Sequence, residues 1–90
     1  MTDQQKYEEL KFLAEQMGLG VRSEIGDFDG GICTVKEQRI ILLNRRHPLA
    51  RRINIMARAL YKAGLDSVFV KPAVRALIDD EVAMFAANEG

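Results

Sequence analysis

The chain has 90 residues, of which 48% are hydrophobic and 29% charged, and its 13 basic and 13 acidic side chains balance. A chain of this length supports one small core, so the sequence predicts a single domain over residues 1–90. The high apolar content is unlike the composition of a disordered chain. The one cysteine, Cys33, excludes an internal disulfide, and the sequence shows neither a signal peptide nor an apolar run of about 20 residues. We therefore expect a cytoplasmic protein without a membrane segment.

The first predicted element is a helix over about residues 3–17. Thr2 and Gln5 have the spacing of a capping box at its start. Gly18 and Leu19 are typical of a Schellman-type end, in which glycine takes the left-handed conformation and the next apolar residue folds back. The apolar residues between them recur at three- and four-residue spacing, which predicts one buried face; they are Tyr7, Leu10, Leu13, Ala14 and Met17.

Three predicted strands follow, over residues 21–25, 32–35 and 39–43. The first two are separated by the glycine- and aspartate-rich turn 26–31, and the last two by the short polar link 36–38. Such tight links predict an antiparallel meander. The continuous apolar run from Ile40 to Leu43 indicates that the third strand is central or covered on more than one side.

Two further helices are predicted after the strands. Pro48 suits the first position of a helix that ends at Gly64, and Pro72 opens a third helix. The sequence leaves open whether residues 82–87 continue that helix or form a separate short one. The predicted fold class is α+β, with an N-terminal helix, a three-stranded antiparallel meander and two to three C-terminal helices packed on one face of the sheet. Its predicted core consists of Leu10, Leu13, Met17, Ile40, Leu42, Ile53, Met56, Leu60, Leu77 and Ile78.

The sequence contains no complete catalytic or metal-binding motif. Cys33 lies inside a predicted strand, which favours a buried structural thiol over a nucleophile paired with His47, a residue expected to be exposed. Asp27 and Asp29 fit an ordinary turn better than a cation site, because the later acidic ligand of a calcium loop is missing. We therefore predict no catalytic residue, no metal ligand and no cofactor.

Charge is segregated along the chain although the total is zero. Residues 39–65 carry seven Lys and Arg and no Asp or Glu, whereas both flanking segments are acidic. Helical spacing groups Arg51, Arg58 and Lys62 on the side of the second helix that faces away from its apolar stripe, and Arg45, Arg46 and Arg52 lie near the start of that helix. We define the basic face as Arg45, Arg46, Arg51, Arg52, Asn54, Arg58, Tyr61 and Lys62.

The basic face predicts a binding surface, because guanidinium groups form paired contacts with carboxylates and phosphates. An acidic protein partner or self-association is the favoured interpretation, and a nucleic acid is the alternative. A third possibility is internal pairing of these arginines with acidic residues of the flanking helices. The function that we predict is a small, non-catalytic protein-interaction or regulatory module.

Residues 30–33, 39–44 and 55–61 are similar to those of a small bacterial family without an established activity. More distantly, residues 30–63 resemble the core of ImmA/IrrE-type zinc peptidases, in which a strand leads through a short loop into the HExxH helix. In that register the two metal histidines would fall at Ala57 and Tyr61, and the catalytic glutamate at Arg58. The resemblance therefore implies a metal-free relic of that core, kept as a scaffold or binding module.

Overall fold

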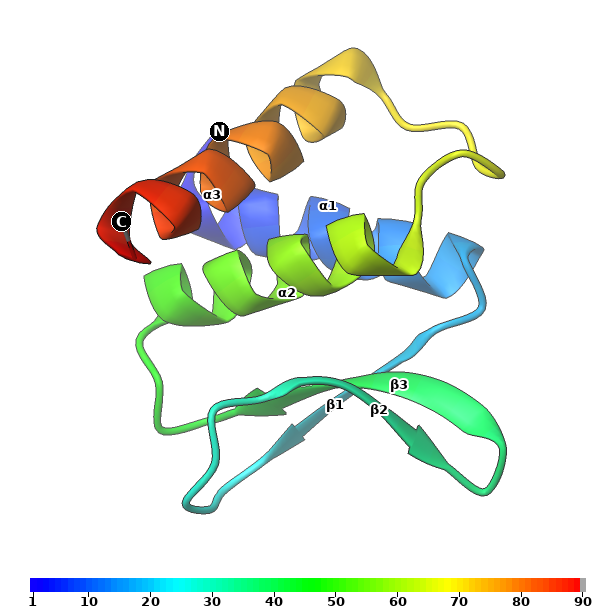
Figure 1. Cartoon of the computed structure of the whole chain (residues 1–90), viewed down its shortest axis with the longest axis vertical. Helices are drawn as coiled ribbons and strands as arrows, with labels where there is room; N and C mark the ends of the chain where they lie inside the picture. Colours follow the sequence, from blue (N-terminus) through cyan, green and yellow to red (C-terminus); the bar gives the residue numbers. More distant parts are fainter. Residues whose placement is uncertain (90) are drawn as a thin grey trace.

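Helices lie on one side of a three-stranded sheet in the computed structural model of this chain, which describes residues 1–89 (Figure 1). α1 and α2 contact the strands, and α3 packs onto α1 and α2. This arrangement confirms the predicted α+β class. The elements in chain order are α1 (Asp3–Gln16), β1 (Gly20–Glu24), β2 (Gly31–Val35), β3 (Gln38–Asn44), α2 (Leu49–Ala63) and α3 (Pro72–Glu89).

The ends of α1 follow the local signals in the sequence. The Thr2 hydroxyl accepts a hydrogen bond from the Gln5 backbone N–H at 3.1 Å, and the Gln5 side chain accepts one from the Thr2 N–H at 2.8 Å. At the other end, the Leu19 N–H donates to the Ala14 carbonyl at 2.9 Å, and Gly18 has a φ of 77°. The predicted capping box and Schellman-type end are both confirmed.

The sheet is mixed, which corrects the predicted antiparallel meander. β3 lies in the middle and pairs in parallel with β1 and antiparallel with β2. Lys36 and Glu37 close the hairpin from β2 to β3 in a two-residue turn, but the longer connection over residues 25–30 does not require β1 and β2 to be neighbours. The most apolar strand therefore takes the central position, where it is shielded from water on both edges.

The core lies between the sheet and the helices. Strand alternation directs Ile41 and Leu43 of β3 toward the helices, where both are fully buried. Leu42 points to the opposite face and is only half-buried, so the prediction that it belongs to the core was wrong. Met17 is half-buried at the edge of the core. The other predicted core residues are buried; these are Leu10, Leu13, Ile40, Ile53, Met56, Leu60, Leu77 and Ile78.

The third helix is continuous, which settles the question left open by the sequence. α3 runs without a break from Pro72 to Glu89, and Val74, Leu77 and Ile78 point inward as predicted. Across residues 1–89, no helix combines the length and the apolar character that crossing a bilayer requires.

Candidate interaction site on α2

α2 leaves one narrow strip of its surface open, because α1, α3 and the sheet all pack against it. Arg51, Tyr61 and Lys62 are exposed on this strip, and Asn54 and Arg58 are half-buried beside them. At 100° per residue, these five residues fall on one side of the helix. The structure therefore brings together five of the eight residues of the basic face.

Arg45 and Arg46 are exposed in the turn between β3 and α2. This turn is fixed by Asn44, whose side chain is buried although it is polar. Asn44 Nδ2 donates to the carbonyl oxygens of Gly26 and Phe28 at 2.8 and 2.9 Å, and its Oδ1 accepts from the Arg46 N–H at 3.0 Å. Satisfied buried polar groups of this kind hold a loop in one conformation. The two arginines thus extend from a firmly held turn.

Arg51 and Arg52 are neighbours in sequence but turn in different directions. Arg51 Nη2 lies 3.2 Å from Asp29 Oδ1 in the connection between β1 and β2, and both side chains are largely exposed. Such a pair stabilises a fold by little, about 0–1 kcal/mol. Arg52 Nε donates to the His47 carbonyl at 3.1 Å, and its guanidinium lies 5.9 Å from the centre of the Tyr7 ring on α1. Arg52 therefore lies apart from the strip that carries Arg51.

Asn54 and Arg58 connect α2 to α3. Asn54 Nδ2 donates to the backbone carbonyl of Glu81 at 3.0 Å, and Arg58 Nε donates to Asn54 Oδ1 at 2.9 Å. The Arg58 guanidinium also lies 3.6 Å from the centre of the Phe85 ring, which is close for a cation–π contact. These two residues of the basic face therefore position α3, and a partner would reach them only in part.

The charge of this region is largely uncompensated within the fold. Of the seven Lys and Arg between residues 39 and 62, only Arg51 lies within 4.0 Å of a carboxylate among the side chains that the structure describes. Beside Arg51, the ends of the three helices border a shallow groove of about 470 Å³, where Lys6 and Glu81 contribute charges of opposite sign. Phe85 and the half-exposed Met84 give this groove an apolar wall.

Sequence reasoning missed two residues that shape the site. Asn44 directly follows an apolar strand, and a polar residue in that position is a signal for a buried hydrogen-bonding role. Phe85 is the aromatic partner of Arg58 but lies 27 residues away in sequence, in a helix whose packing partner the pattern alone does not identify.

The structure also places the residues that could have suggested catalysis. Cys33 is half-buried, not buried as predicted, and lies opposite Ile40 in the sheet. His47 follows Asn44 at the far end of β3, about 13 Å along the strand. The two side chains therefore do not form a nucleophile and base. His47 is half-buried, not exposed as expected, and its Nδ1 has no hydrogen-bond partner among the described residues. Within residues 1–89, no three His, Cys, Asp or Glu side chains are grouped to hold a metal ion.

No protein-family model, curated protein or solved structure matches this chain. The resemblance to a small bacterial family and to the core of ImmA/IrrE-type peptidases stays a prediction. In the structure, Ala57 is buried in the core and Arg58 contacts α3, so two of the three positions in the peptidase register are occupied by packing residues.

Proposed function

We propose that this protein is a small, non-catalytic cytoplasmic module that binds an acidic protein partner through the basic face. One observation carries the proposal: Arg51 is the one residue among the seven Lys and Arg at positions 39–62 with a carboxylate within 4.0 Å in the described part of the chain. Charge that the fold does not neutralise is available to attract carboxylates of a partner. Cys33, a free thiol, suits a reducing compartment such as the cytoplasm.

An acidic protein is favoured over a nucleic acid as the partner. Proteins that bind single strands usually offer aromatic rings on which bases stack. Beside the basic face, the ring of Phe85 is already covered by Arg58, so the half-exposed Tyr61 is the aromatic residue of the face itself. The zero net charge of the chain also weakens the long-range attraction to a polyanion.

The proposal is tested by charge reversal at residues that make no side-chain hydrogen bond within the described chain. In the double variant Arg46→Glu, Lys62→Glu, binding of a synthetic Glu- and Asp-rich peptide should weaken by at least about tenfold, because two attractive charges become repulsive. The matched control, Lys11→Glu with Lys36→Glu, makes the same change of charge on α1 and at the hairpin turn. Amide NMR titrations give the affinity and the site. Equal weakening in both variants would contradict the proposal.

A parallel titration with single-stranded RNA separates the two kinds of partner. Binding through phosphates would lose affinity steeply with salt, with a slope of about −0.7 per phosphate contacted. We expect the RNA to bind more weakly than the peptide at the same ionic strength. Tighter RNA binding at residues 45–62, with that salt dependence, would replace the acidic-protein proposal with the nucleic-acid alternative.

A further inference from the structure

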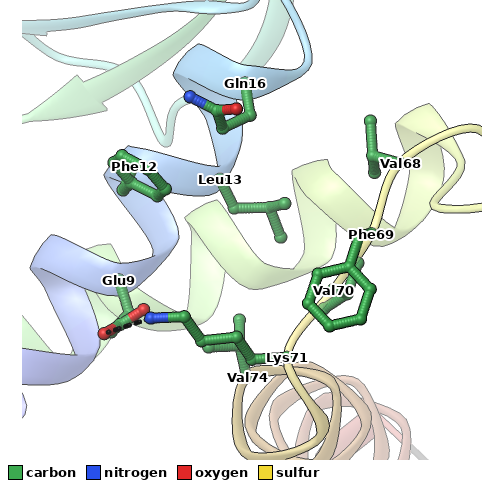
Figure 2. A pocket seen from close by; sticks show the side chains of 9 residues that line it. All are labelled: Glu9, Phe12, Leu13, Gln16, Val68, Phe69, Val70, Lys71 and Val74. Atoms are coloured by element: carbon green, nitrogen blue, oxygen red, sulfur yellow. Dashed lines mark ion pairs between the residues drawn. The ribbon is translucent and has the colours of Figure 1, made fainter.

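A second surface lies on α1 and the connection between α2 and α3, and it shares no residue with the basic face. Figure 2 shows a groove there, with Phe12 of α1 and Phe69 of the connection on opposite sides and Leu13 between them. Phe12 is 58% exposed and Phe69 is 84% exposed. Two exposed phenylalanines beside one apolar groove are typical of an interaction surface.

The size of the groove limits what it can hold. Its volume of about 240 Å³ is below the roughly 300–1,000 Å³ of sites for drug-sized ligands. A cavity of about 150 Å³ is enough for a benzene ring, so one aromatic side chain fits. Phe69 lines its own groove and is nevertheless 84% exposed, so an exposed ring and a pocket for a ring lie side by side on each copy.

We propose that this surface forms a homodimer with two-fold symmetry, in which Phe69 of each copy enters the groove of the other. Two-fold contacts require a patch that is complementary to itself, and an adjacent projecting ring and pocket satisfy this requirement. This inference does not depend on the proposed function of the basic face.

The exposed rings account for a large part of the area that a weak dimer needs. A phenylalanine side chain presents roughly 200 Å². At the exposed fractions of Phe12 and Phe69, the two rings offer on the order of 280 Å² per copy. A specific interface buries at least about 1,000 Å² in total, or about 500 Å² per copy, so the rings supply more than half. The half-buried Val68 and Val70 and the polar rim of the groove can supply the rest.

A two-fold dimer would also bring opposite charges together at the rim of the groove. Lys71 Nζ lies 3.6 Å from Glu9 Oε1 across the groove (Figure 2), and the Lys71 side chain is 62% exposed. In a two-fold dimer, Lys71 of each copy can face Glu9 of the other. Near them, the backbone N–H groups of Phe69 and Val70 donate no hydrogen bond within residues 1–89, so they too are available for pairing with a second copy.

The first test is the oligomeric state of the full chain. We expect sedimentation equilibrium to show a monomer–dimer exchange below about 0.5 mM, and Phe69→Ser to weaken the dimer at least tenfold. Because Phe69 is 84% exposed in the monomer, its loss should leave the circular dichroism spectrum and the melting midpoint nearly unchanged. Tyr61→Ser and Met84→Ser remove exposed side chains elsewhere and serve as controls. A wild-type protein that stays monomeric, or a dimer that survives Phe69→Ser, would overturn the proposal.

A charge-swap experiment then tests the two-fold geometry. Glu9→Lys places like charges opposite each other in its own dimer, and so does Lys71→Glu, so each variant alone should be mainly monomeric. In an equimolar mixture, both pairs become attractive across the interface, and native mass spectrometry should detect the mixed dimer in excess over either homodimer. Variants that dimerise separately as well as the wild type, with no excess of the mixed species, would contradict reciprocal pairing of these residues.

Discussion

Gly30 shows how one residue can fix the path of the chain into β2. Its φ of 100° is unfavourable for any residue with a side chain, and a Cβ atom there would lie 2.6 Å from the Leu42 carbonyl oxygen. Gly30→Ala should therefore lower the free energy of unfolding by about 2–4 kcal/mol, since the backbone strain and the steric clash add. Urea denaturation followed by circular dichroism measures the change.

Gly18→Ala is the matched control for this prediction. Gly18 also has a positive φ, 77°, but a Cβ atom there would meet no atom within 4 Å. This variant should lower the free energy of unfolding by about 1–2 kcal/mol, because only backbone strain is added. If Gly30→Ala lowered the free energy of unfolding by no more than Gly18→Ala does, the close approach of the Leu42 carbonyl would not contribute to the loss of stability.

Arg58 illustrates why charge alone does not define a binding residue. Its hydrogen bond to Asn54 and its contact with the Phe85 ring tie α2 to α3, so its replacement would disturb packing as well as charge. Arg46 and Lys62 have no such contacts among the described residues and are the better positions for testing binding.

At the level of elements, the hairpin between β2 and β3 carries avoidable strain. Lys36 and Glu37 both have positive φ, at 50° and 69°, a conformation in which Asn and Gly are far more favourable. Lys36→Asn with Glu37→Gly should raise the free energy of unfolding by about 1–2 kcal/mol, or the melting midpoint by about 4–8 °C for each kcal/mol. Lys36→Gln with Glu37→Gln removes the same charges without relieving the backbone and should change stability by less than about 0.5 kcal/mol. A similar increase in the free energy of unfolding in both variants would mean that the loss of charge, not the relief of backbone strain, stabilises the hairpin.

The elements differ in how far the sequence determines them. The ends of α1 were predictable because Thr2, Gln5 and Gly18 act through contacts within a few residues. The strand order was not predictable. β1 pairs with β3 although β2 lies between them in the sequence, and that choice depends on burial of the whole sheet. The side of α2 that carries Arg51 and Lys62 followed from helical spacing.

The groove was not predicted, although the sequence holds part of the signal for it. Phe12 lies off the apolar stripe of α1, so its exposure could have been anticipated from helical spacing. Phe69 is 57 residues away, in a connection without regular structure. Only the packing of α3 against α1 brings the two rings to the same groove.

For the whole molecule, the two proposed surfaces have a joint consequence. A dimer formed through the groove would use no residue of the basic face, because the two surfaces have no residue in common. Each dimer would then carry two sites for an acidic partner. Linked sites bind a multivalent surface more tightly than a single site does, because the second contact forms at high effective concentration.

This predicts a difference between free and immobilised partners. On a surface densely coated with the acidic peptide, the wild-type protein should bind about 10–100-fold more tightly than Phe69→Ser, because only the dimer engages two peptides at once. With the same peptide free in solution, the two proteins should bind equally, since Phe69 is not part of the basic face. Surface plasmon resonance at high and low peptide density, with calorimetry for the free peptide, makes the comparison. Loss of binding by Phe69→Ser in solution as well would mean that the groove itself contacts the acidic partner, and that the two surfaces act as one site.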